Sequence, residues 1–135
     1  MGFECFTVVR VPFPFTDRTT TKNRPALVLS DASAFNTPAG HSVMAMITSQ
    51  ANPPWPLDCT LSDLSSAGLP APSKVRFKLF TLDHRLVRGE IGRLSATDAD
   101  AVRQGLDQLL GSAPQKPSPR PPENQSLALP PDTRP

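Results

Sequence analysis

The stretch of residues 8–30 constrains the fold of this chain most strongly, because it holds two strand-like runs joined by a polar segment. Residues 6–11 are β-branched and aromatic, which favours an extended strand. Residues 25–30 form a short apolar run of the length expected for a buried strand. The intervening residues 16–24 include no apolar side chain. We therefore expect a β-hairpin with a long polar loop, and loops held on rigid strands often carry function.

The ends and the charge of this loop add two further constraints. Pro12 and Pro14 lack an amide donor, so the first strand must end there or lie at an edge of the sheet. Arg18, Lys22 and Arg24 make the loop basic, although the formal net charge of the whole chain is only +2. Any positive charge that attracts a ligand must therefore come from local clusters of basic residues and not from the net charge of the chain. A second basic group lies later in the chain and consists of Lys74, Arg76, Lys78, Arg85 and Arg88.

The rest of the chain predicts more short strands and one terminal helix. Residues 42–47 are apolar on both alternating faces, which is typical of a central strand covered on both sides. A connection at residues 31–40 precedes this strand. Further strand-like runs follow at residues 57–61, 75–82 and 90–94. Residues 62–68 predict one or two helical turns. Five or so short strands followed by a helix favour a mainly β fold, either a small, strongly bent sheet or a partly open barrel.

The terminal helix has a clear start and is followed by a change in composition. Ser95 suits the N-cap, and Asp98 stands three residues later, as in a capping box. One apolar stripe follows at helical spacing and consists of Ala99, Val102, Leu106, Leu109 and Leu110. Eight of the 17 prolines lie in residues 112–135, where there is almost nothing to bury. We therefore expect one domain over residues 1–111 and a disordered, proline-rich tail over residues 112–135.

Several kinds of site and location are not predicted. The sequence has no phosphate-binding glycine motif and no carboxylate or histidine pattern with metal-ligand spacing, so we expect no metal and no other cofactor. Cys5 and Cys59 have neither zinc spacing nor a redox motif, and His41 and His84 lie on different elements. No secretion signal and no apolar run of about 20 residues is present, so we expect a cytoplasmic protein without membrane contact.

Five segments of the sequence resemble a known toxin family. They are Val-Pro-Phe-Pro-Phe-Thr-Asp at residues 11–17, Arg-Pro-Ala-Leu-Val-Leu-Ser at 24–30, Met-Ala-Met-Ile-Thr-Ser at 44–49, Ser-Lys-Val-Arg-Phe-Lys-Leu-Phe-Thr-Leu-Asp at 73–83 and Ile-Gly-Arg-Leu-Ser at 91–95. In this order and spacing, the chain from about residue 6 to residue 110 resembles the MazF/PemK (Kid) family of bacterial toxins. The resemblance implies an α+β fold, a small SH3-like barrel of the MazF/PemK/CcdB type with a C-terminal helix, which is usually dimeric.

The resemblance also implies a site that cuts RNA. In the family pattern, an arginine before the proline of the second strand and a threonine closing the third strand form the cleavage site, and these match Arg24 and Thr48. RNA can be cut without a metal when a 2′-hydroxyl attacks the adjacent phosphorus and leaves a 2′,3′-cyclic phosphate. A guanidinium can bind the phosphoryl oxygens bidentately as they gain charge. We expect further contacts with single-stranded RNA from Arg18, Lys22, Asn23, Ser49, Gln50, Arg76 and Lys78.

Two positions depart from the family pattern, and one aromatic residue has an open role. Many relatives begin the first strand with Gly-Asp, where this chain has Phe6 and Thr7, and some carry an acidic residue where this chain has Lys78. A role for that acid is therefore not carried over. Trp55 is flanked by prolines and suits stacking on a base or on a partner peptide.

Two functions from different classes follow. The first is a homodimeric toxin endoribonuclease that cuts single-stranded RNA as an mRNA interferase, held in check by a cognate antitoxin protein. A small, DNA-binding antitoxin encoded by a neighbouring gene would favour it. The alternative is a non-enzymatic module on the same barrel, which binds protein or nucleic acid or poisons a topoisomerase as CcdB-like toxins do. The combination of Arg24 with Thr48 favours the endoribonuclease.

Overall fold

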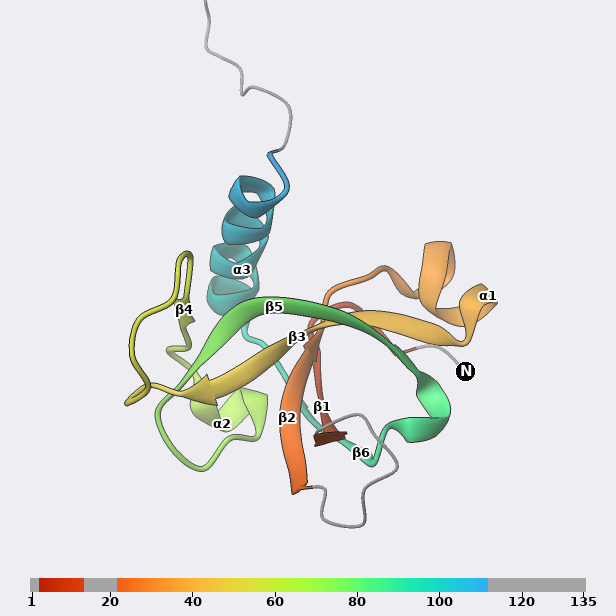
Figure 1. Cartoon of the computed structure of the whole chain (residues 1–135), viewed down its shortest axis with the longest axis horizontal. Helices are drawn as coiled ribbons and strands as arrows, with labels where there is room; N and C mark the ends of the chain where they lie inside the picture. The colour runs from red at the N-terminus through yellow and green to blue at the C-terminus, as the bar shows by residue number, and fades with distance from the viewer. Residues whose placement is uncertain (1–2, 14–21, 112–135) are drawn as a thin grey trace, which may run out of the picture.

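The described part of the chain folds as one curled antiparallel sheet with a helix after its last strand (Figure 1). A computed structural model describes residues 3–13 and 22–111. Its strands are β1 (Thr7–Phe13), β2 (Lys22–Val28), β3 (His41–Ser49), β4 (Cys59–Thr60), β5 (Ser73–Asp83) and β6 (Gly89–Arg93). Its helical segments are η1 (Ala32–Asn36), α1 (Thr37–Ala39), α2 (Leu64–Ala67), η2 (His84–Leu86) and α3 (Ala96–Leu109).

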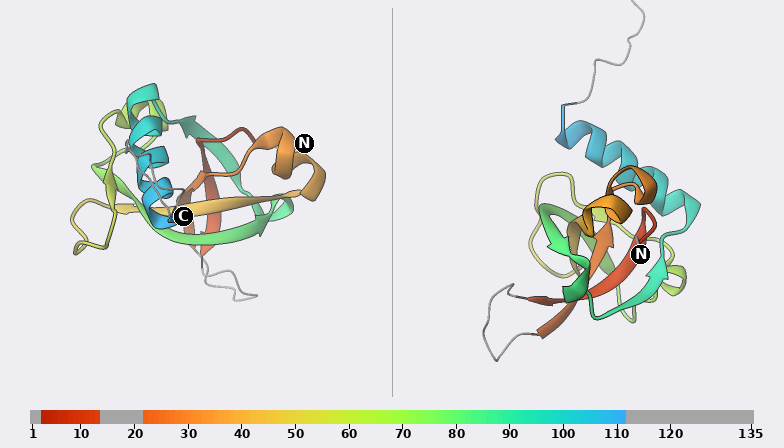
Figure 2. Two further views of the ribbon diagram at one scale, coloured as in Figure 1. Left: turned by 90° about the horizontal axis from the view of Figure 1, so that it is seen from above. Right: turned by 90° about the vertical axis from the view of Figure 1, so that its right-hand side faces the viewer.

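The strand order across the sheet is β4-β5-β3-β2-β1-β6. Every neighbouring pair is antiparallel. The sheet bends strongly, so that β5 and β6 curve toward each other as the two sides of a half-barrel (Figures 1 and 2). The mainly β fold with a C-terminal helix, expected from the sequence, is confirmed.

The strand bounds differ from the expected ones where proline is involved. β1 continues through Pro12 to Phe13, and Pro12 is paired with Asn23 of β2. On its other side β1 is paired with β6 only as far as Arg10, so this proline lies where the strand has one neighbour. Residues 31–40, expected to be a plain connection, contain η1 and α1. The strand expected at residues 57–61 is reduced to the two residues of β4.

Apolar side chains are buried on both faces of the sheet, as expected for the central strands. β3 lies between β2 and β5, and its Met44 packs in one apolar cluster while Ala45 and Ile47 pack in the other. β2 alternates in the same way, with Leu27 in one cluster and Val28 in the other. Along the central strands, two buried faces leave mainly the strand ends to present polar groups to a ligand, whereas β5 presents Arg76 and Lys78.

The cap of α3 uses its two predicted residues for different contacts. The Ser95 hydroxyl accepts a hydrogen bond from the backbone N–H of Asp98 at 3.2 Å, as an N-cap should. The Asp98 carboxylate itself reaches the turn before α2. It accepts from the N–H and the hydroxyl of Ser62 and from the N–H of Asp63. The start of α3 is therefore fastened to the turn that precedes α2.

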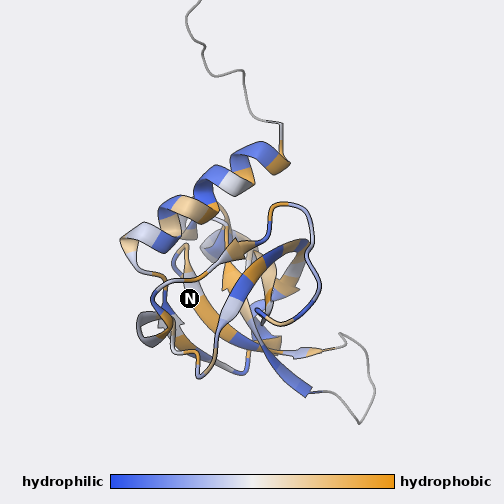
Figure 3. Ribbon diagram, turned by 90° about the vertical axis from the view of Figure 1, so that its left-hand side faces the viewer, coloured by the Kyte–Doolittle hydropathy of each residue, from blue (hydrophilic) through white to orange (hydrophobic). Residues whose placement is uncertain are grey.

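The apolar stripe of α3 is buried at its start only. Val102 is fully buried, whereas Leu109 and Leu110 at the far end of the stripe are 39% and 66% exposed. The reason is geometric, because the last turns of α3 project past the sheet (Figures 2 and 3). None of the helices in the described residues is both long and apolar enough to cross a bilayer.

α2 lies directly on β6, at a distance that only glycine permits. Gly68 ends α2 with φ +74°, and a Cβ at this position would lie 1.9 Å from the carbonyl oxygen of Ile91. On the strand, a Cβ at Gly92 would lie 2.4 Å from the carbonyl carbon of Ala67. This contact fixes the direction in which residues 69–73 leave the helix.

Candidate functional site

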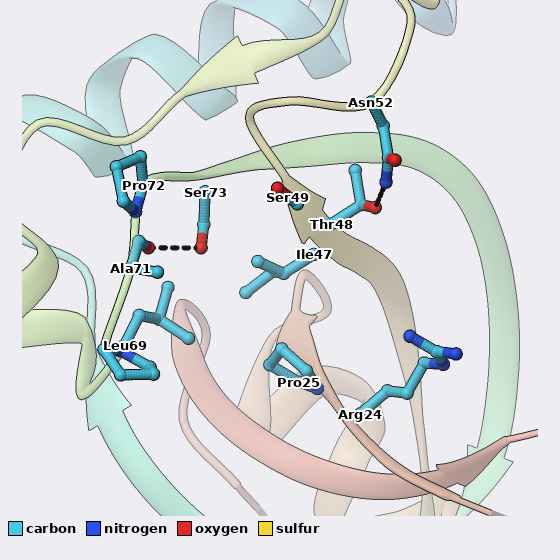
Figure 4. Close-up of a pocket in the computed structure, with 11 residues that line it drawn as sticks. Arg24, Pro25, Ile47, Thr48, Ser49, Asn52, Leu69, Ala71, Pro72 and Ser73 are labelled. Carbon is cyan, nitrogen blue, oxygen red and sulfur yellow. Dashed lines mark hydrogen bonds between the residues drawn. The ribbon is translucent and has the colours of Figure 1, made fainter.

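Arg24 and Thr48 are brought together by the register of two central strands. In the ladder between β2 and β3, Ala26 is paired with Met46. Because the strands are antiparallel, Arg24 and Thr48 each lie two residues beyond this last pair, at the same end of the ladder. Both residues line one open pocket of about 290 Å³ (Figure 4). Residues 69–73 form part of the same lining, on the segment whose direction α2 determines.

The end of β3 holds its hydroxyl groups in defined positions. The side-chain amide of Asn52 donates a hydrogen bond to the Thr48 hydroxyl oxygen (Figure 4). The Ser49 hydroxyl accepts from the backbone N–H of Ala51 at 3.1 Å. Since both hydroxyl oxygens accept bonds, each hydroxyl proton stays available to donate to a ligand in the pocket. Asn52 was not predicted, and its only sequence signal is its place just after the strand end.

A second hollow adjoins the first and is lined by cations. It has a volume of about 180 Å³ and is lined by Arg24, Thr48, Arg76 and Lys78, together with Phe13 and neighbouring β3 residues. The Arg24 guanidinium carbon lies 5.9 Å from the centre of the Phe13 ring. Arg24 is exposed and makes no ion pair with any residue in the described part of the chain. Its charge is therefore available to an anionic ligand.

A partly buried carboxylate organises the cations of β5. Asp58 accepts two hydrogen bonds from Arg76, at 3.2 Å from Nε and 2.9 Å from Nη2, and lies 3.2 Å from the Lys74 ammonium. It also accepts from the backbone N–H of Trp55 at 3.0 Å. The Arg76 guanidinium holds the pKa of the Asp58 carboxyl below its ordinary value. Lys74 was recognised in the second basic group of the sequence, but nothing local indicated that Asp58 pairs with it.

The remaining RNA-contact candidates are less closely grouped. Asn23 lines a third hollow with Arg10 and Arg24, and its side-chain oxygen accepts from Arg88 at 3.3 Å. Ser49 lines the first pocket, but Gln50 accepts from the Thr60 hydroxyl and lines none of these three hollows. Lys22 is exposed at the start of β2 and also lines none of them. Arg18 lies outside the described residues.

The two histidines lie at the opposite end of β3 from Thr48. His41 begins this nine-residue strand and Thr48 is its eighth residue, a separation of about 23 Å for an extended strand. His84 Nε2 is 2.7 Å from the Ser42 hydroxyl, and His41 Nδ1 is 2.9 Å from the Ala39 carbonyl. Neither ring can serve the Arg24 site. Across residues 3–13 and 22–111, no three His, Cys, Asp or Glu side chains are grouped as metal ligands.

Comparison with known proteins identifies the family. The model of the PemK-like, MazF-like toxins of type II toxin–antitoxin systems matches residues 4–110. The chain belongs to this PemK/MazF family. A comparison with curated protein sequences finds no match.

Solved PemK/MazF structures share the fold over their whole length. A chain of the MazE–MazF crystal structure (form III) from Deinococcus radiodurans is 28% identical, with 84% of this chain and 100% of that chain covered and a TM-score of 0.66. An endoribonuclease in complex with its cognate antitoxin from a mycobacterial species is 16% identical, with 83% and 96% covered and a TM-score of 0.64. The Mycobacterium tuberculosis toxin MazF-mt6 is 18% identical, with 79% and 98% covered and a TM-score of 0.62.

Proposed function

We propose that this PemK/MazF chain is a toxin endoribonuclease that cuts single-stranded RNA without a metal ion. The observation that supports this best is the pocket that Arg24 and Thr48 both line, at one end of the ladder between β2 and β3. No carboxylate of the described residues lines the three hollows around Arg24, and Asp58, on the loop before β4, is engaged by Lys74 and Arg76. The polar groups left for a ligand are then a guanidinium, hydroxyls and amides, which suit a phosphate.

In the proposed reaction, the 2′-hydroxyl of the RNA attacks the adjacent phosphorus. The bond to the 5′-oxygen of the next nucleotide breaks, so one product ends in a 2′,3′-cyclic phosphate and the other in a 5′-hydroxyl. Solvent water accepts the proton of the 2′-hydroxyl and supplies one to the leaving 5′-oxygen. Arg24 binds the phosphoryl oxygens as negative charge gathers there, and a preorganised donor of this kind is worth about 3 kcal/mol in other enzymes. Thr48 donates a hydrogen bond from its hydroxyl to the same oxygens. Both side chains act by binding charge and orienting the phosphate.

The substrate strand is proposed to lie across the three hollows that meet at Arg24. Single-stranded RNA suits this surface because its unstacked bases can turn into separate pockets. Residues proposed to contact it are Arg18, Lys22, Asn23, Ser49, Gln50, Arg76 and Lys78. Positive charge at Lys78 and Arg76 would hold the phosphate next to the cleaved one.

The proposed partners are a second copy of the chain and a cognate antitoxin. Two of the similar solved structures are described as a MazE–MazF complex and as an endoribonuclease with its cognate antitoxin. An acidic antitoxin segment that covers the cations around Arg24 would exclude RNA by charge competition. We place the protein in the cytoplasm, where such a pair would meet its mRNA substrate.

The test is cleavage of a long single-stranded RNA by the purified protein in excess EDTA. We expect cleavage with 2′,3′-cyclic phosphate ends, and Arg24→Ala should abolish it. Arg85→Ala is the matched control, since this exposed arginine is paired with Asp83 at the other end of the sheet. Loss of cleavage in EDTA with recovery on adding Mg²⁺ would overturn the proposed site, as would wild-type cleavage by Arg24→Ala.

A further inference from the structure

Trp55 places a large exposed ring beside the candidate site. Its residue surface is 42% exposed. The ring centre lies 4.6 Å from Nζ of Lys78 and 5.7 Å from the guanidinium carbon of Arg76. These two cations also line the hollow that contains Arg24 and Thr48. The same pair of side chains therefore connects the indole to the proposed phosphate position.

The loop that carries Trp55 is held firmly, although it contains three prolines between residues 50 and 58. The Asp58 carboxylate accepts from the Trp55 N–H and from Arg76. Lys74 and Arg76 donate to the backbone carbonyls of residues 52 and 53, at 2.8 and 2.6 Å. Because β5 fixes the loop at several backbone positions, the ring is set in place before a ligand arrives, which lowers the entropic cost of binding.

We propose that Trp55 is the base-stacking residue of the RNA site and receives an unpaired base next to the cleaved phosphate. This inference rests on the proposed function. An indole face stacks on any base, and neighbouring cations favour the attached phosphates. The carboxylates of an acidic peptide would engage Lys78 but offer no aromatic face to stack on the ring.

The chain has a single tryptophan, so the emission of the wild-type protein reports on Trp55 alone. The probe is an RNA segment that spans a mapped cut, with a 2′-deoxy sugar at the attacking position so that it cannot be cleaved. If no cut is found, the intact long RNA serves as the probe. We expect saturable quenching of the emission by RNA and none by a poly-Glu peptide.

Variants then measure the contribution of the ring. Trp55→Ala should bind the same RNA roughly 10- to 100-fold more weakly, and Trp55→Phe should retain most of the affinity. Phe35→Ala is the matched control, because Phe35 is 39% exposed on η1, at the other end of β3. Thermal melts of every variant establish that each is folded. The wild-type titration carries the test even if Trp55→Ala is unstable.

The outcomes separate this inference from the proposed function. If RNA is cut but does not quench the emission, and Trp55→Ala binds RNA with wild-type affinity, then base stacking is refuted. The proposed endoribonuclease function would be unaffected by that result. Quenching by RNA that is never cut would support stacking and refute the endoribonuclease. Quenching by poly-Glu but not by RNA would show that Trp55 serves a peptide partner, which also overturns the inference.

Discussion

Asp98→Ala should destabilise the protein by about 3 kcal/mol, although Asp98 lies outside the candidate site. The residue is 2% exposed, and its carboxylate accepts from two backbone amides, Ser62 N–H at 3.0 Å and Asp63 N–H at 2.9 Å. Truncation leaves both amides without an acceptor, at about 1–2 kcal/mol each. The Ser62 hydroxyl also loses its 2.8 Å partner but can rotate toward water.

For a domain of this size, a loss of about 3 kcal/mol lowers the melting midpoint by roughly 15 °C. Asp100→Ala is the matched control, because Asp100 has the same charge near the start of α3 but is exposed. Thermal melts followed by circular dichroism give both midpoints. If Asp98→Ala melts within about 3 °C of Asp100→Ala, the argument that these hydrogen bonds fasten α3 is wrong.

The same carboxylate predicts a dependence on pH. Burial acts to raise the pKa of Asp98, but hydrogen bonds from Asp63 and Ser62 outweigh it and hold the pKa below its ordinary value. A group with a lowered native pKa stabilises the fold above its unfolded pKa of about 3.9, and this stabilisation is lost as the pH falls through the native pKa. The gap in unfolding free energy between wild type and Asp98→Ala should therefore be full near neutral pH and narrow below about pH 4. Urea titrations at several pH values measure it, and a gap that grows in acid would contradict the assignment.

Three further predictions concern the site, the tail and the assembly. Arg24→Lys should restore little RNA cleavage, because an ammonium cannot bind two phosphoryl oxygens at once; Thr48→Ala should lower the single-turnover rate less steeply, and a reversed order would exchange the two roles. A chain that ends at Gly111 should keep the melting midpoint of the full chain, since residues 112–135, which lie outside the described residues, are predicted to bury almost nothing; a large drop would mean that the tail docks. Light scattering should give about twice the monomer mass of 14.6 kDa. RNA should compete with the antitoxin for binding to the protein. Simultaneous binding of RNA and antitoxin would rule out inhibition by occlusion of the RNA site.

The strands could be predicted from the sequence because burial leaves a regular pattern in the chain. Residues 43–47 are apolar at every position, and β3 is indeed buried on both faces. Pro12 limited its own position to the end of a strand or to a part of a strand with one neighbour. In the structure it lies in β1 beyond the last residue paired with β6, so it has a neighbour on one side only. Periodicity was less reliable at Leu109 and Leu110, since a helical pattern does not show where the surface beneath the helix ends.

The candidate site could be predicted only in part. Arg24 and Thr48 came from a family pattern that already contains the pairing of β2 with β3. The contacts of Asp58 with Arg76 and of Asp98 with Ser62 join residues 18 and 36 positions apart. Such pairs depend on which strands and turns become neighbours, and the spacing of residues within one element does not predict them. Arg76 was therefore expected as a phosphate contact, without its partner Asp58.

The way in which one carboxylate serves two cations limits how this surface can evolve. The side chains of Lys74 and Asp58 are only 5% and 12% exposed. Loss of Asp58 alone would leave the buried Lys74 ammonium without a counter-charge, beside the Arg76 guanidinium, and would lower the free energy of unfolding by about 3 kcal/mol or more. Replacing all three charged residues together avoids that penalty. The three positions should therefore covary across relatives as a unit. Single changes at any of them should show strong epistasis with the other two.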